Sequence, residues 1–144
     1  MLSTMSKWYF GHFIDSTNNV LSFNDGSAKT ATLNVGDYSL TEFATEIARA
    51  MNAASSLTFT VSINRTTRLM TVSAGSTFEL SVTSGSSSNP YTLMGFTGAD
   101  KTGANTYTGA VASGSEFKPQ LKLQKFINFG DEQIASYSNV AKSA

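Results

Sequence analysis

The chain has 144 residues and no cysteine, which excludes disulfide bonds, a thiolate nucleophile and cysteine-ligated metal sites. Ten Lys and Arg balance ten Asp and Glu, and only 14% of the residues are charged, so there is no basic stripe of the kind that binds nucleic acid. This length suits one domain that can bury a core without covalent help.

Hydroxyl residues dominate the polar composition, with 21 Ser and 18 Thr. Charge repulsion gives such a neutral surface little protection from self-association, which favours a chain covered by partners in an assembly. An extracellular domain that tolerates neutrality explains the composition equally well. Residues 1–14 lack the apolar run and cleavage site of a signal peptide. No stretch approaches the roughly 20 apolar residues that span a bilayer, so we expect no membrane partner.

The first elements are an aromatic segment and two strands. Four aromatic residues lie within seven positions, and they are Trp8, Tyr9, Phe10 and Phe13. After a polar turn, residues 20–23 are typical of a strand, and Asn24-Asp25-Gly26 of a tight turn. Ala31, Leu33 and Val35 alternate with polar residues, which predicts a strand over 30–35 with one buried face, ended by Gly36.

The strongest local pattern predicts a helix over residues 39–54. Ser39 and Glu42 fit a capping box, and Tyr38 with Phe43 fits the hydrophobic staple beside it. The spacing assigns Leu40, Phe43, Ala44, Ile47, Met51 and Ala54 to an apolar stripe, and Thr41, Glu42, Thr45, Glu46, Arg49 and Asn52 to the solvent face. Such a stripe needs a sheet to pack on.

The second half of the chain predicts more strands and a short helix. Alternating residues indicate a hairpin of 57–63 with 69–73, and a third strand over 78–82. Residues 91–96 are expected to form one helical turn that plugs the core. Gly98 to Gly114 has little to bury, so we expect a long exposed connection.

The expected fold class is therefore α+β: an antiparallel sheet, as a sandwich or small barrel, with one amphipathic helix packed on it. Residues 1–118 would form the core domain and 119–144 an extended C-terminal arm. After Phe117, lysines alternate with apolar residues of the arm, which are Leu121, Leu123, Phe126, Ile127 and Phe129. We hypothesise that the arm docks on a neighbouring subunit by adding a strand to its sheet; a last strand packed at home is an equal alternative.

Few residues in the sequence support catalysis. His12 is the single histidine and lies in the aromatic segment, which favours a structural or surface role. Asp15, Asp25 and Asp37 are expected in turns, where carboxylates bond nearby amides. The Gly98–Gly103 stretch fails the phosphate-loop motif, and no segment has EF-hand spacing. We expect no enzyme activity, metal or cofactor.

Several short segments together resemble a family of small virion proteins of tailed bacteriophages. The resemblance spans roughly residues 8–119. Its motifs are Ile14-Asp15-Ser16-Thr17-Asn18-Asn19, Leu21-Ser22-Phe23, Thr30-Ala31-Thr32-Leu33, Tyr38-Ser39-Leu40-Thr41, Val61-Ser62-Ile63-Asn64-Arg65-Thr66-Thr67, Leu93-Met94-Gly95-Phe96 and Tyr107-Thr108-Gly109.

The resemblance implies a non-enzymatic structural component of the virion, in the tail, neck or baseplate, made in the host cytoplasm. Its partners would be other virion proteins and copies of itself in a ring-like assembly. The interface residues expected are Trp8, Tyr9, Phe10, Phe13, Leu121, Leu123, Phe126, Ile127 and Phe129. A receptor- or glycan-binding module, with Trp8 and the Gly98–Gly114 loop around its site, is the alternative. A small hydrolase is a third class, disfavoured by the lone histidine.

Overall fold

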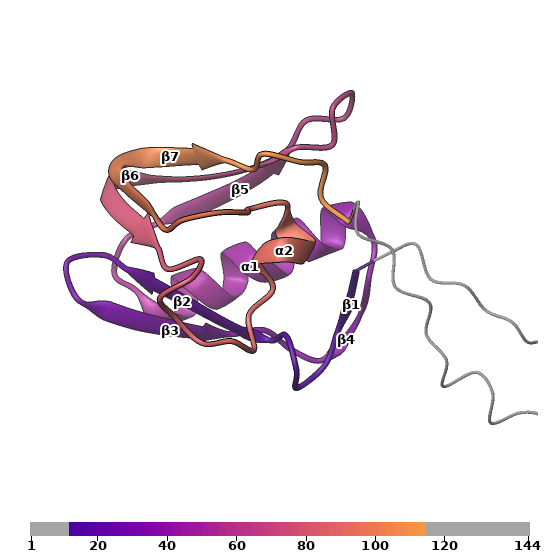
Figure 1. Ribbon diagram of the computed structural model, residues 1–144, viewed down its shortest axis with the longest axis horizontal. Helices are drawn as coiled ribbons and strands as arrows, with labels where there is room; N and C mark the ends of the chain where they lie inside the picture. The colour runs from indigo at the N-terminus through magenta and orange to yellow at the C-terminus, as the bar shows by residue number, and fades with distance from the viewer. Residues whose placement is uncertain (1–11, 115–144) are drawn as a thin grey trace, which may run out of the picture. The chain divides into compact units, whose positions relative to one another are not determined.

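The computed structural model describes residues 12–114, which form an α+β fold with two antiparallel sheets and one main helix, as the sequence predicted (Figure 1). The helices are α1 (Leu40–Ala54) and α2 (Tyr91–Met94). The strands are β1 (His12–Ile14), β2 (Val20–Asn24), β3 (Ala28–Thr32), β4 (Gly36–Tyr38), β5 (Phe59–Ile63), β6 (Met70–Leu80) and β7 (Lys101–Thr108). Within this part of the chain, no helix is long and apolar enough to cross a bilayer.

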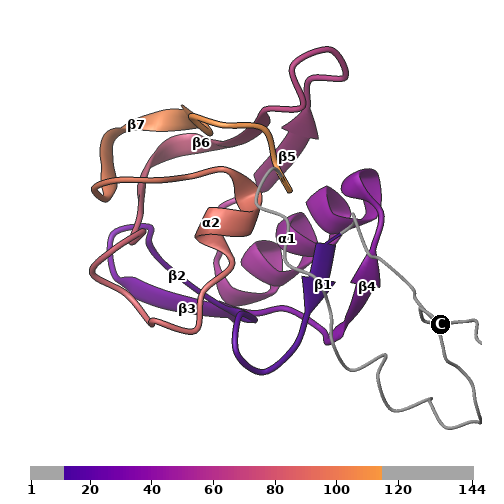
Figure 2. The ribbon, with the colours of Figure 1, turned by 45° about the vertical axis from the view of Figure 1, so that its right-hand side comes forward.

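The long strand β6 joins the two halves of the main sheet. Its first half pairs with β5 through residues 70–74, and its end pairs with β2 through Glu79 and Leu80. On the other edge, β7 runs beside both halves. Between two β6–β7 pairs, β6 has residues 74–77 where β7 has only Asn105, and such bulges bend a strand. The sheet therefore curls, and its two hairpins lie on either side of α1 (Figures 1 and 2).

The helix α1 begins where the sequence predicted. Ser39 Oγ accepts the Glu42 N–H at 3.3 Å, and Glu42 Oε1 accepts the Ser39 N–H at 3.0 Å, which completes the capping box. The staple residues Tyr38 and Phe43 pack with ring centroids 6.4 Å apart. Most of the predicted apolar stripe is buried in the core, together with Ala50. Packing on the two hairpins therefore stabilises a helix that the local sequence starts.

Glu46 was predicted to face solvent, and this prediction is wrong, because the residue is buried. Its carboxylate accepts the Asn34 N–H at 2.7 Å and two N–H groups of Arg49, at 2.9 and 2.6 Å. Arg49 also donates to the Thr32 carbonyl. The Arg49 bonds and the Asn34 amide outweigh burial and lower the pKa of Glu46. This network ties the middle of α1 to the segment after β3.

The strand predicted over 30–35 lies two to three residues earlier, at Ala28–Thr32. Ala31 and Leu33 are buried as expected, but Val35 is 64% exposed, so its predicted burial is wrong. The chain leaves the β2–β3 hairpin after Leu33 and pairs instead with β1, through Gly36–Tyr38. Gly36 and Asp37, predicted to end a strand and form a turn, therefore belong to β4.

Two predictions for the second half are also wrong. The strand predicted over 78–82 is the end of β6, which continues from the hairpin to Leu80. The exposed connection predicted over 98–114 contains β7. Its Thr, Gly and Ala residues show no apolar alternation, but their backbone pairs with β6. Tyr107 anchors the strand, because its hydroxyl donates to the Phe78 carbonyl at 2.6 Å.

The predicted helical plug is confirmed as α2. Tyr91, Met94 and Phe96 are buried, and the Tyr91 hydroxyl donates to the Ser22 carbonyl at 2.5 Å. Gly95 ends the helix with a φ of +96°, and a Cβ there would lie 2.2 Å from the Val111 carbonyl oxygen. Only glycine fits a left-handed residue so close to another backbone.

Replacing Glu46 with Ala should lower the free energy of unfolding by about 2 kcal/mol, because the Asn34 amide and the Arg49 guanidinium lose their acceptor. Urea unfolding at neutral pH measures this effect. The matched control is Glu79→Ala, which removes an exposed carboxylate from β6. Equal effects of the two substitutions would contradict the assigned role of Glu46.

Candidate interaction surface

The hairpin turn between β5 and β6 presents two arginines at one end of the sheet. Asn64 Oδ1 accepts the N–H groups of Thr66 and Thr67, both at 2.9 Å, and the Asn64 carbonyl accepts the Arg68 N–H at 2.6 Å. Arg68 has a φ of +63°, a left-handed conformation rare outside glycine and asparagine. The turn is thus held by its own backbone and by Asn64, which leaves the side chains of Arg65 and Arg68 exposed.

The outer edge of β5 is only partly paired. At its start, the Phe59 N–H donates to Asn52 Oδ1 at 2.7 Å and the Phe59 carbonyl accepts from Asn52 Nδ2 at 3.1 Å. Phe59 therefore directs its polar backbone groups away from β6. The direction of the backbone N–H and carbonyl groups alternates from one residue to the next in an antiparallel strand, so every second residue points the same way. Val61 and Ile63 therefore also direct these groups outward, as Phe59 does. Met70, the partner of Ile63, supports this assignment, because its carbonyl accepts the Gly109 N–H on the β7 side, away from β5.

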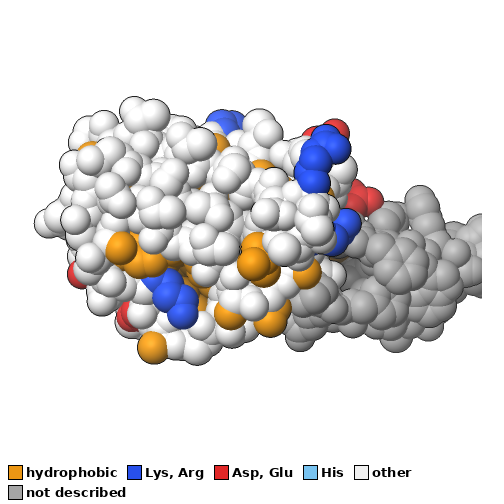
Figure 3. Space-filling model, turned by 90° about the horizontal axis from the view of Figure 1, so that it is seen from above, with side chains coloured by type: hydrophobic (Ala, Val, Ile, Leu, Met, Phe, Trp, Pro, Cys, Tyr) orange, Lys and Arg blue, Asp and Glu red, His pale blue; other side chains and the backbone are white. Residues whose placement is uncertain are grey.

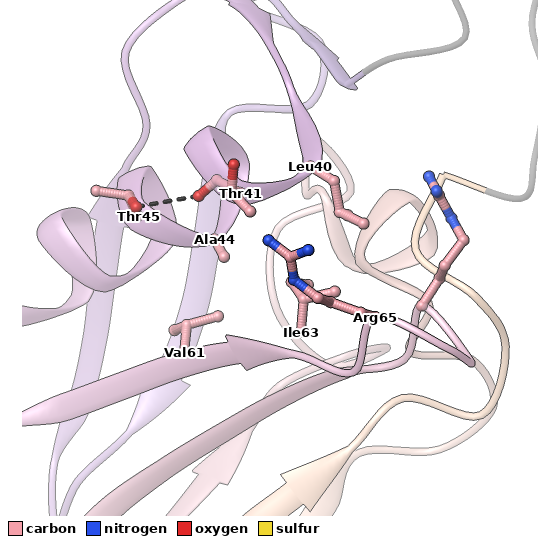
Figure 4. Close-up of a pocket in the computed structure, with 8 residues that line it drawn as sticks. Leu40, Thr41, Ala44, Thr45, Val61, Ile63 and Arg65 are labelled. Atoms are coloured by element: carbon pink, nitrogen blue, oxygen red, sulfur yellow. Dashed lines mark hydrogen bonds between the residues drawn. The ribbon is translucent and has the colours of Figure 1, made fainter.

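A groove lies between this edge and the first turns of α1. Its volume is about 470 Å³, and it is lined by Leu40, Thr41, Ala44, Thr45, Val61, Ile63, Arg65 and Arg68. Figure 4 shows the Arg65 side chain reaching from the hairpin turn toward α1, over the apolar side chains of the groove. On the helix side of the groove, the Thr45 hydroxyl donates to the Thr41 carbonyl at 3.0 Å, so this hydroxyl already has a hydrogen-bond partner.

Within the described residues, the two arginines of this groove form no ion pair. Two ion pairs form among residues 12–114, Lys29 with Asp25 and Arg49 with Glu46, and neither includes the groove arginines. The described residues as a whole, the two groove arginines included, carry more acids than bases, seven Asp and Glu against five Lys and Arg. The groove is therefore a local positive site on a domain of opposite net charge.

His12 forms a buried cluster near the groove. Its side chain is 1% exposed, stacks on Phe43 with centroids 4.6 Å apart, and has Nε2 3.1 Å from Ser113 Oγ. Ser113 Oγ donates to the Leu93 carbonyl, and Ser113 N–H to the Arg68 carbonyl. Burial, and to a lesser extent the charge of Arg68, lowers the pKa of His12 to about 4. The cluster holds Ser113 beside β1, which gives His12 a structural position of the kind that the sequence favoured.

Two of the acids expected in turns, Asp15 and Asp25, have hydrogen-bond partners in the structure. Asp15 Oδ1 accepts the Thr17 N–H at 2.9 Å, and Asp25 accepts from the Ser55 hydroxyl, which joins the β2–β3 turn to the end of α1. Asp100, in the stretch rejected as a phosphate loop, accepts the Thr83 N–H at 2.7 Å and Ser84 N–H at 3.1 Å; hydrogen bonds from these residues lower its pKa to about 2. Within residues 12–114, no three His, Asp or Glu side chains form a candidate metal site.

Of the predicted interface residues, the structure places only Phe13, which is half-buried in β1. The others lie outside the described residues, and they are Trp8, Tyr9, Phe10, Leu121, Leu123, Phe126, Ile127 and Phe129. The same holds for the arm of residues 119–144. Sequence reasoning missed Arg65 and Arg68, which it treated only as turn residues. Two arginines in one hairpin turn without a neighbouring acid were the available signal.

Comparison with known proteins does not assign the chain to a family. No protein-family model matches the sequence, and no curated protein matches it.

The buried His12 should make stability depend on pH. The unfolded chain binds a proton near the ordinary pKa of 6.5, whereas the folded chain does so only near 4, so stability is complete above pH 6.5 and falls as the pH drops toward 4. We expect a loss of about 2 kcal/mol between pH 7 and pH 5, measured by urea unfolding.

His12→Phe is the matched control, because phenylalanine keeps the stacking on Phe43 but cannot titrate. Its stability should change much less over the same interval. An unchanged pH dependence in this variant would show that other groups are responsible.

Proposed function

We propose that this protein is a non-enzymatic structural component of a tailed-phage virion, in its tail, neck or baseplate. Contacts with other virion proteins and with copies of itself in a ring-like assembly would carry the function. The resemblance of its segments to small virion proteins motivates the proposal. The observation that supports it best is the positive groove of Arg65 and Arg68 beside an open strand edge, a feature that suits binding a partner chain.

The surface chemistry agrees with an assembly role. One face of the domain, seen in Figure 3, consists mostly of neutral side chains and backbone with few charged groups. The exposed residues of β7 are Thr, Gly and Asn, and Lys101 is the one charged residue in this strand. Edge strands of soluble monomers are commonly protected by charges, prolines or short length. An eight-residue edge strand with one lysine suits a domain whose edges are covered by neighbours.

The use of the acids points the same way. Asp25, Glu46 and Asp100 each accept hydrogen bonds that hold the fold together. The titratable His12 is buried in the core and has a hydroxyl partner instead of a carboxylate. These four ionisable side chains thus stabilise the fold through internal hydrogen bonds, while the groove and the strand edges remain available for contacts.

The rival receptor- or glycan-binding module loses one of its supports. Its proposed site needed an exposed loop over residues 98–114, and residues 101–108 of that segment form the strand β7. Trp8, its other element, lies outside the described residues. We therefore do not propose that function.

Quantitative mass spectrometry of purified particles, made by the organism or phage that encodes this chain, tests the proposal. The protein should be present at a fixed multiple relative to the major capsid and tail-tube proteins, because a ring position has a defined copy number. A non-structural protein made by the same cells serves as the control for contamination. Absence from the particles, or an amount that varies like the contaminant, would rule out the virion role.

A further inference from the structure

We propose that the groove between α1 and β5 is a docking site for an extended, acidic segment of a different protein of the particle. The segment would add a strand to the outer edge of β5 and place its carboxylates against Arg65 and Arg68. This inference rests on the proposed assembly function and deepens it by naming the chemistry of one partner.

The strand edge supplies backbone partners for such a segment. Val61 and Ile63 direct their N–H and carbonyl groups outward, and no backbone hydrogen bond beyond the sheet ladders is made by either residue within the described part of the chain. Asn52 occupies the same edge only at Phe59. The amide of Asn52 thus acts as a stop: an added strand can begin beyond Phe59 and extend toward the arginines. Strand addition of this kind draws affinity from main-chain hydrogen bonds.

The opposite wall gives a strand somewhere to bury a side chain. Leu40 and Ala44 of α1 face Val61 and Ile63 across the groove (Figure 4), and the two β5 residues are half-buried. Alternate residues of an added strand point the same way, so one set enters the groove and the other faces solvent. The apolar lining therefore favours an apolar residue at the inward positions.

The charge selects an acidic partner. Arg65 and Arg68 have no carboxylate within ion-pair distance among residues 12–114. An arginine can donate two parallel hydrogen bonds to one carboxylate, which makes it a specific binding partner for acidic side chains. Both arginines lie at the same end of the groove, so they fix the direction of the bound segment as well as its charge.

The flanking parts of this chain fit the groove poorly by charge. Residues 1–11 contain Lys7 and no acid, and residues 115–126 contain three lysines against Glu116 alone. The adjacent pair Asp131-Glu132 is the one acidic cluster in the flanks. For this reason the proposal names a different protein as the source of the segment, and a peptide containing this pair becomes an arm of the test.

The test titrates the full chain, labelled for amide NMR, with a short peptide of alternating valine and threonine that ends in two glutamates. A peptide that ends in two lysines is the charge control, and an N-methylated version of the acidic peptide removes its strand hydrogen bonds. We expect the acidic peptide to shift the Val61 and Ile63 amides. The lysine and N-methylated peptides should bind at least about tenfold more weakly, which corresponds to about 1.4 kcal/mol.

Two variants check the arginines. Arg65→Glu with Arg68→Glu should reverse the charge preference, because both side chains are exposed and neither forms an ion pair within the described residues. Lys29→Glu with Lys101→Glu makes the same charge change on β3 and β7, and should leave the preference unchanged. Amide spectra that match the parent spectrum away from the substitutions show that each variant is folded.

Three results would overturn the proposal: shifts that avoid Val61 and Ile63, equal binding of the acidic and lysine peptides, or tight binding of a peptide of residues 121–134 in the groove. The last result would assign the groove to a second copy of this chain. Because the copy count in particles is a separate measurement, the assembly function can hold while the groove proposal fails.

Discussion

The fold depends on one long strand, β6, that joins the two halves of the main sheet. β6 pairs with β5 at its start and with β2 at its end, while β7 follows its other edge throughout. Because β6 bends between β5 and β2, the β5–β6 and β2–β3 hairpins are separated. The space between these hairpins must be filled with apolar side chains. The apolar stripe of α1 fills it, with Phe43, Ile47 and Met51 fully buried. The position of the helix follows from the bend of β6.

That arrangement also explains why the groove exists. The end of α1 is tied to β5 by the two hydrogen bonds of Asn52, and the connection between them is only four residues long. The first half of α1 is tied elsewhere, through Glu46 in its middle to Asn34 and through the staple residue Phe43 near its start to Tyr38. The end of α1 is therefore held close to the start of β5, whereas the start of α1 is held away from the end of β5. The space between them opens toward the hairpin turn that carries the two arginines.

Local signals in the sequence predicted the elements that local chemistry determines. The Ser39–Glu42 capping box and the α2 plug were found where expected, and the hairpin strand predicted over 57–63 is β5, which begins two residues later at Phe59. β7 was missed because its side chains have no period of two, and its pairing comes from β6 instead. Val35 and Glu46 were misplaced for a different reason. Their burial depends on where the chain turns after Leu33, which is a tertiary event. Similarly, no local pattern could show that Arg65 and Arg68 border a groove formed by residues 40–45.

The zero net charge of the chain conceals a separation of charge along it. The described domain carries two more acids than bases, and the flanking segments carry two more bases than acids. Within the domain, most charged side chains are used in internal hydrogen bonds or ion pairs, so few remain to direct association. On a neutral, hydroxyl-rich surface, two unpaired arginines at one end of a groove have a disproportionate effect on which partner is accepted and in which direction, because electrostatic complementarity contributes more to specificity than to affinity.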